Sequence, residues 1–193
     1  MTNVTFKPKQ FFKTIAIFLV LTLGWTIVCI RTDEFTDRDK GFVTGVGFLF
    51  LFSISIFIGQ DLKRISQFGY LILLTFGTFI IGSFVLGLLI SSATDSMIVY
   101  SFANALFVSW TMIYFVNKIV KIDFKTQATI VTFLFLLLAY FLIDKLSDQL
   151  YLNYNIHPRI TMFGIFQLFL IVPLTLGMTL KRVTRHADIN NGV

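Results

Sequence analysis

Long uncharged stretches, separated by short clusters of charged residues, dominate the pattern along this chain of 193 residues. A helix rises about 1.5 Å per residue and the hydrocarbon layer of a bilayer is about 30 Å thick, so about 17 to 25 apolar residues cross it once. We therefore expect transmembrane helices at about residues 12–31, 41–60, 66–91, 96–117, 126–144 and 159–180. The third range is too short for two crossings and a turn, so we interpret it as one long or tilted helix.

Helices, not strands, fit the internal pattern of these stretches. Backbone polar groups in lipid must be satisfied within the protein, which leaves helix bundles or closed barrels. A barrel strand alternates apolar and polar residues over about ten positions. The run Phe48–Phe52 is apolar at every position. The sequence therefore predicts an all-α integral membrane protein, with six transmembrane helices and residues 1–193 as a single membrane domain.

Composition agrees with burial in lipid. Hydrophobic residues make up 56% of the chain and charged residues only 13%, against about 25% charged in soluble domains. The connections between the predicted helices are short, which leaves no room for a separate soluble domain. The longest of them, Asp144 to Arg159, carries several Leu and Tyr, and we expect it to be a loop lying in the headgroup layer as an aromatic belt or as a lid.

Positive residues indicate the orientation, because Lys and Arg are retained on the cytoplasmic side. With the N-terminus inside, eleven positive residues are cytoplasmic: Lys7, Lys9, Lys13, Lys63, Arg64, Lys118, Lys121, Lys125, Lys181, Arg182 and Arg185. Five are external: Arg31, Arg38, Lys40, Lys145 and Arg159. We predict both ends inside (N-in/C-in), residues 181–193 as a cytoplasmic tail, and a multi-pass location in a bacterial cytoplasmic (inner) membrane. The net charge of +6 then indicates contact with anionic lipid, and we expect no nucleic-acid partner.

Two alternatives concern the organisation of the chain. Lys7 to Lys13 followed by an apolar run resembles a signal peptide, but no small-x-small cleavage site follows it. An inverted repeat of three helices is suggested by residues 64–69 (RISQFG) and 159–164 (RITMFG), which would lie on opposite membrane faces. This match does not extend further, so the repeat stays an open alternative.

Residues absent from the predicted spans exclude several kinds of site. Charged groups inside a membrane usually mark ion paths, proton relays or voltage sensors, and the six uncharged stretches contain none. His157 and His186 fall in a loop and the tail, and Cys29 lies near the outer end of the first helix. We therefore expect no metal, no cofactor and no catalytic residue inside the membrane. A lipid-modifying enzyme that uses His157 is a separate alternative, and no motif of a known family is present.

Polar and small residues within the spans mark where a site or a helix contact could be. Candidates for lining a pocket or path are Asn104, Ser101, Ser109, Gln167 and Pro173, since a proline frees a backbone carbonyl of its helix. Candidates for close helix packing are Gly41, Gly45, Ser83, Gly87 and Ala105. The simpler interpretation is that the amides only bond to neighbouring helices.

Two functions remain from the sequence. The first is channel-like or carrier-like permeation of a small solute or ion. The alternative is a structural or sensing subunit of a membrane complex that acts through partner binding or membrane perturbation. In either case the protein lies in the lipid bilayer. A second copy or another membrane protein is a candidate partner for the helix faces that carry the small packing residues.

Overall fold

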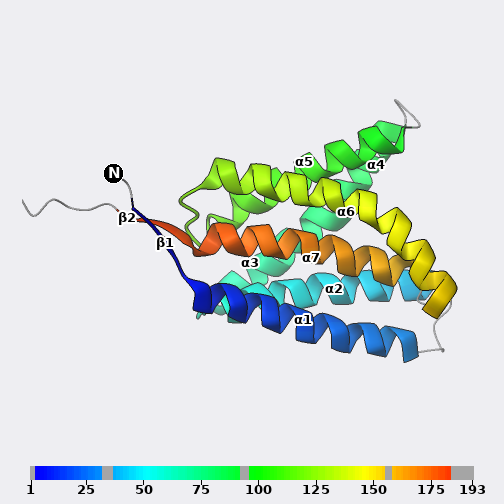
Figure 1. Cartoon of the computed structure of the whole chain (residues 1–193), viewed down its shortest axis with the longest axis horizontal. Coiled ribbons are helices and arrows are strands. Elements are labelled where there is room, and N and C mark those ends of the chain that lie inside the picture. Colours follow the sequence, from blue (N-terminus) through cyan, green and yellow to red (C-terminus); the bar gives the residue numbers. More distant parts are fainter. Residues whose placement is uncertain (1–2, 32–36, 92–95, 155–157, 184–193) are drawn as a thin grey trace, which may run out of the picture.

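The computed structural model describes residues 3–31, 37–91, 96–154 and 158–183, which are almost entirely helical. In chain order the elements are β1 (Asn3–Phe6), α1 (Pro8–Arg31), α2 (Asp37–Gly59), α3 (Ile65–Phe76), the π-helical segment η1 (Gly77–Gly82), α4 (Ser83–Ser91), α5 (Met97–Val116), α6 (Lys125–Tyr154), α7 (Pro158–Thr179) and β2 (Leu180–Val183). The helices run side by side along the long axis of the molecule (Figure 1). Each predicted helical range is occupied by helix. The prediction for residue 157 and for the tail beyond residue 183 lies outside the described residues.

Four helices in the described part of the chain are long and apolar enough to cross a membrane, which indicates a membrane protein. They span Pro8–Cys29, Ile98–Val116, Lys125–Ile143 and Met162–Thr179. Two shorter apolar helices occupy Thr44–Gly59 and Ile65–Phe79. On the outer surface, Val20 is 70% exposed, Ile98 74% and Phe141 68%, although all three are apolar. Apolar side chains spread over the outward faces of α1, α5 and α6 in this way suit contact with lipid, not water.

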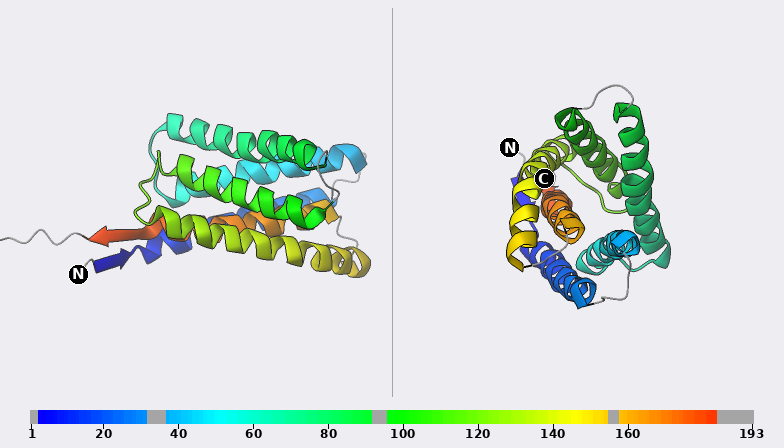
Figure 2. Two further views of the ribbon diagram at one scale, coloured as in Figure 1. Left: turned by 90° about the horizontal axis from the view of Figure 1, so that it is seen from above. Right: turned by 90° about the vertical axis from the view of Figure 1, so that its right-hand side faces the viewer.

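Helix α7 runs through the interior of the bundle. It packs against α6, α2 and α1 and also contacts α5, and an end-on view shows it enclosed by the other helices (Figure 2). Its side chains Leu170, Ile171 and Leu174 are fully buried. Its polar residues Gln167, Thr175 and Thr179 are also buried, so they face protein and not lipid.

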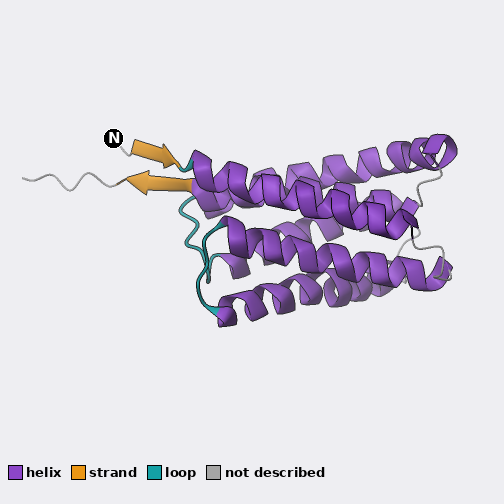
Figure 3. Ribbon diagram, turned by 90° about the horizontal axis from the view of Figure 1, so that it is seen from below, coloured by secondary structure: helices purple, strands orange, loops and turns teal. Residues whose placement is uncertain are grey.

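A two-stranded antiparallel ribbon, which the sequence did not predict, joins the two ends of the described chain in an otherwise almost entirely helical fold. Strand β1 pairs with β2 in the register Asn3↔Val183 to Phe6↔Leu180. The amide nitrogen of Lys7 donates to the carbonyl oxygen of Thr179 at 3.1 Å and extends the pairing to the helices. We call this end of the bundle, with the connections 60–64 and 117–124, the ribbon end (Figure 3).

Helix α6 is longer than predicted. The sequence favoured a loop from Asp144 to Arg159, but the helix continues to Tyr154 and has 30 residues. At 1.5 Å per residue it is about 45 Å long, which exceeds the hydrocarbon thickness. The charged residues end the apolar run but not the helix. Helical hydrogen bonds form in the headgroup layer as they do in the hydrocarbon layer, and no glycine or proline intervenes before Pro158.

The third predicted helix, 66–91, contains an irregularity that the sequence did not reveal. The π-helical segment η1 interrupts it between α3 and α4, with a glycine at each end. A π-helical turn adds a residue and changes the direction in which the following side chains point, and such turns frequently occur at functional sites. The first helix also begins earlier than residue 12, because Pro8 suits the first helical position, where no N–H bond is required.

Candidate functional site

Gln167 is the most unusual polar residue in the bundle. It lies on α7 with its side chain 1% exposed, and neither Oε1 nor Nε2 has a hydrogen-bond partner among the described residues. Twelve residues separate it from Thr179, where α7 ends. This places it about 18 Å from the ribbon end, near the middle of a bilayer-sized layer. An amide carries donors and acceptors that are costly to bury unpaired, so this position calls for an explanation.

A second amide lies at the same depth but is paired. Asn104 of α5 is 4% exposed, and its Nδ2 donates to the hydroxyl oxygen of Tyr140 in α6 at 2.6 Å. Twelve residues separate Asn104 from Val116 and fifteen separate Tyr140 from Lys125, about 18 and 22 Å along their helices. The Tyr140 hydroxyl keeps its own proton to donate, because it accepts from Asn104.

Three aromatic rings connect this layer across helices. The ring of Phe166 in α7 contacts Tyr140 of α6 edge to face, with centroids 5.4 Å apart at 72°. It also contacts Phe79 of η1, with centroids 5.4 Å apart at 81°. Gln167 directly follows Phe166, and Thr78 directly precedes Phe79. The Thr78 side chain is 3% exposed, and its Oγ1 has no partner among the described residues. We name Thr78, Asn104, Tyr140 and Gln167 the mid-bundle polar layer.

Other buried hydroxyl groups lie closer to the ribbon end. Thr111 of α5 and Thr175 of α7 are buried, and neither hydroxyl has a partner in the described part of the chain. They lie five and four residues from the ends of their helices, about 6 to 8 Å from the ribbon end. Ser53 and Thr75 are satisfied instead, by a bond of 3.1 Å that joins α2 to α3. Unpaired polar atoms thus recur between the mid-bundle polar layer and the ribbon end.

The remaining predicted lining residues contribute less to this layer. Ser109 is buried, but its hydroxyl donates to the carbonyl of Leu106 at 3.0 Å. Ser101 is half-buried on α5. Pro173 is buried within α7, six residues beyond Gln167.

The predicted packing residues divide into two groups. Ala105 is fully buried within the single chain. A side chain added at Gly45 would come within 2.8 Å of the ring of Phe163, so this glycine lets α2 approach α7. None of the predicted packing residues lies on α7. The other three predicted packing residues, Gly41, Ser83 and Gly87, are not described beyond their backbone. Burial of Ala105 removes it from any contact surface for a second copy.

Two residues of the layer, Tyr140 and Thr78, were not predicted from the sequence, and neither was the adjoining ring of Phe166. Tyr140 had a visible signal, because it places a hydroxyl within the uncharged run Leu136–Ile143. Phe166 and Thr78 had none, since phenylalanine and threonine recur in every predicted span. Among the described residues, no group of three or more His, Cys, Asp or Glu is placed to hold a metal ion.

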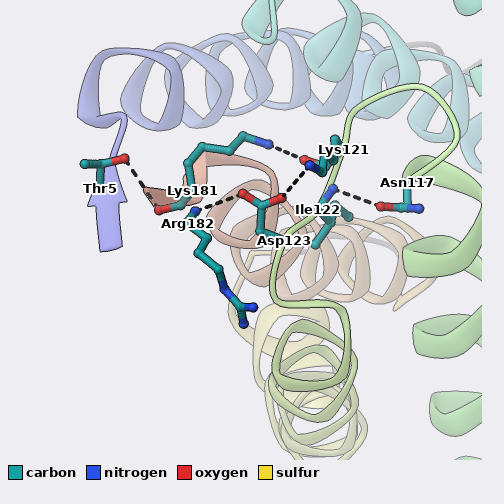
Figure 4. Close-up of polar contacts among 7 residues, drawn as sticks. All are labelled: Thr5, Asn117, Lys121, Ile122, Asp123, Lys181 and Arg182. Atoms are coloured by element: carbon teal, nitrogen blue, oxygen red, sulfur yellow. Dashed lines mark hydrogen bonds and ion pairs between the residues drawn. The ribbon is translucent and has the colours of Figure 1, made fainter. Parts of the chain in front are cut away.

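The ribbon end has a different chemistry: it is charged, and polar contacts join several of its groups (Figure 4). The Asp123 carboxylate accepts from the amide nitrogen of Arg182 at 2.9 Å and lies 3.7 Å from the ammonium group of Lys121. The Lys181 ammonium group donates to the carbonyl of Lys121. The Arg182 amide, and then the nearby Lys and Arg charges, lower the pKa of Asp123 against the opposing effect of its partial burial. These bonds attach β2 to the connection between α5 and α6.

A second ion pair closes the same end. The Lys13 ammonium group of α1 donates to the carboxylate of Asp61, which follows α2, and this bond lowers the pKa of Asp61. Asn117 Oδ1 accepts from the amide nitrogen of Ile122 at 2.9 Å and shapes the connection between α5 and α6. The ribbon end is therefore held by polar contacts between segments distant in sequence.

The chain matches no model of a known protein family, and comparison with curated proteins and with solved structures also found no match.

Proposed function

We propose that this protein carries a small neutral solute across a membrane, through a site at Gln167 in the mid-bundle polar layer. One observation supports this function above others: both polar atoms of Gln167 are buried at mid-depth without a partner among the described residues. An unpaired amide in an apolar interior costs several kcal/mol by water-to-hydrocarbon transfer. A solute that binds there and satisfies the amide gives a physical reason for such a residue.

A neutral solute is favoured over an ion. The described residues of α3, η1 and α5 contain no charged side chain, and none lies at the depth of Gln167 on α6 or α7. An ion at that depth needs an opposite charge or many oriented dipoles, because desolvation in a low dielectric is expensive. Amide and hydroxyl groups suit an uncharged polar molecule instead.

We further propose six crossings with both ends in the cytoplasm of a bacterial cell. The pairing of β1 with β2 supports an even number of crossings, because it holds the two ends of the described chain on one side of the bundle. The residues of the ribbon end include ten Lys or Arg against two Asp, and such an excess is typical of the cytoplasmic side. These residues are Lys7, Lys9, Lys13, Lys63, Arg64, Lys118, Lys121, Lys125, Lys181 and Arg182, with Asp61 and Asp123.

Solute flux into liposomes tests the proposal. Purified protein is reconstituted, and shrinkage and reswelling of the vesicles are followed by stopped-flow light scattering with urea, acetamide, glycerol and potassium chloride. We expect faster reswelling with at least one neutral solute than in protein-free vesicles, and no effect with the salt. Gln167→Leu should remove the increase, while Gln127→Leu, the same change at an exposed position on α6, should not.

Vesicles that pass none of these solutes at any protein density contradict the proposal. The alternative of a structural or sensing subunit then becomes the better interpretation. Flux that is equal in Gln167→Leu also contradicts it, because the residue on which the proposal depends would have no part in transport.

A further inference from the structure

We infer that the solute carries a carboxamide or urea group, which pairs with the side chain of Gln167. This inference depends on the proposed function and identifies the chemical class of its solute. It follows from the geometry of one side chain. A planar amide presents an N–H donor and a C=O acceptor side by side, and in Gln167 neither has a partner among the described residues.

Both atoms are satisfied together by a group that carries a donor beside an acceptor. A second amide or a urea places its own donor opposite the acceptor and its own acceptor opposite the donor, so two parallel hydrogen bonds form. A ketone or ether offers an acceptor alone and leaves the Gln167 carbonyl unpaired. A buried group left unpaired loses the hydration it had in water, so a site with open donors and acceptors rejects solutes that fill only half of them.

The neighbouring groups fit the rest of such a solute. Thr78 Oγ1 lies in the same layer without a partner among the described residues, and Tyr140 has a proton left to donate to a carbonyl. The Tyr140 ring contacts Phe166, Thr78 directly precedes Phe79 in the chain, and the contact between Phe79 and Phe166 joins η1 to α7. Flat aromatic faces suit a planar amide or urea better than a branched polyol.

Asn104 serves as an internal comparison. It carries the same functional group as Gln167 at about the same depth, but its Nδ2 is already bonded to Tyr140. Asn104 is therefore paired with a protein side chain, and we infer that the solute takes the place of such a partner at Gln167. Substitution at the two amides should have different effects on solute recognition.

Two measurements on the full-length protein test the inference, and both use acetamide as the probe. The first is the liposome assay with acetamide, urea and glycerol. We expect acetamide and urea to enter at least about five times faster than glycerol through the protein, the scale of one hydrogen bond. Gln167→Met, which keeps the length of the side chain but removes both polar atoms, should reduce acetamide entry by a similar factor. Gln127→Met should have no effect.

The second measurement is direct binding. Glutamine side chains are labelled with ¹⁵N, and the Gln167 signal is identified by its loss in Gln167→Met or, where that variant does not fold, in Gln167→Asn. Acetamide should shift the Gln167 Nε2 signal in a saturable way, while N,N-dimethylacetamide, which has no donor, should shift it far less.

The outcomes separate the inference from the proposed function. Entry of glycerol as fast as acetamide, or acetamide entry unchanged in Gln167→Met, overturns the inference but leaves transport of a neutral solute intact. A saturable shift of the Gln167 signal without any flux supports the binding chemistry and overturns the transport function. Absence of both flux and shift overturns both.

Discussion

The side-chain nitrogen of Asn104 in α5 and the hydroxyl oxygen of Tyr140 in α6 lie 2.6 Å apart and form a hydrogen bond between neighbouring helices. This bond satisfies the side-chain nitrogen of a buried amide. Gln167 has the same chemistry on α7 without such a bond. The difference between the two amides is the basis for assigning packing to one and solute contact to the other.

The Asn104–Tyr140 bond should contribute modestly to stability. Interhelical polar contacts in membranes average about 0.6 kcal/mol and reach about 1.7, because the unfolded helices also find partners. We expect Asn104→Leu to cost at most about 1 to 2 kcal/mol and to leave acetamide flux largely intact. A double-mutant cycle with Tyr140→Phe, measured by unfolding in mixed micelles, should give a coupling within that range. Loss of flux in a well-folded Asn104→Leu protein would place Asn104 in the path instead.

Gly59 should tolerate no side chain. A methyl group added there would come within 2.6 Å of the Cα atom of Thr14, so α1 and α2 would have to separate at the ribbon end. We expect Gly59→Ala to cost about 1 to 3 kcal/mol, the usual range for overpacking. Gly69→Ala is the matched control, because nothing lies within 4 Å of a methyl group at that position. Equal unfolding midpoints for the two variants in a denaturant titration would show that α1 and α2 are not in close contact there.

Reporter fusions should place the ribbon end in the cytoplasm. We expect a reporter after Arg185 to be cytoplasmic and reporters inserted near Asp37 or Asp148 to face outward, because positive residues collect at the ribbon end. Alkaline phosphatase and green fluorescent protein fusions, which are active on opposite sides, give independent readings. Tags at the two termini that report opposite sides would mean an odd number of crossings and would contradict the proposed topology.

The attachment of β2 through Asp123 should weaken in acid. The pKa of this carboxyl is below its ordinary value of 3.8 in the folded protein. The charged form therefore stabilises the fold above pH 3.8, and this contribution is lost as the pH falls below 3.8 through the folded-state value. The Arg182 amide proton, which points at the carboxylate, should report this in an NMR titration with a midpoint below 3.8. Asp123→Asn keeps an acceptor but cannot titrate, so its Arg182 signal should not follow this transition; a midpoint above 3.8 in the unmodified protein would contradict the prediction.

Sequence reasoning located helices better than contacts. The uncharged runs predicted helical ranges that match the structure within a few residues at most boundaries, and the exception is α6, which continues to Tyr154 beyond the charged residues. It also selected Asn104 and Gln167 as buried amides, and both are buried. The sequence did not show which of the two amides is paired, because the partner of Asn104, the Tyr140 hydroxyl, lies 36 residues away along the chain. Nor did it find the pairing of β1 with β2, since neither four-residue strand has a partner nearby in sequence.

The lipid surroundings explain why helices were predictable from the sequence and contacts between them were not. Length and absence of charge are sufficient to specify an apolar helix in lipid, because every backbone hydrogen bond is made inside the segment. Clusters of charged residues mark where the apolar runs end, but not where α6 ends, since this helix continues to Tyr154. The sequence does not specify which face of each helix points inward. Lipid tails are as apolar as leucine, so hydrophobic periodicity no longer distinguishes the inside of the bundle from the outside. Only the tertiary structure therefore decided that α7 lies in the interior, that Asn104 meets Tyr140, and that Gln167 is left with two open hydrogen-bonding atoms.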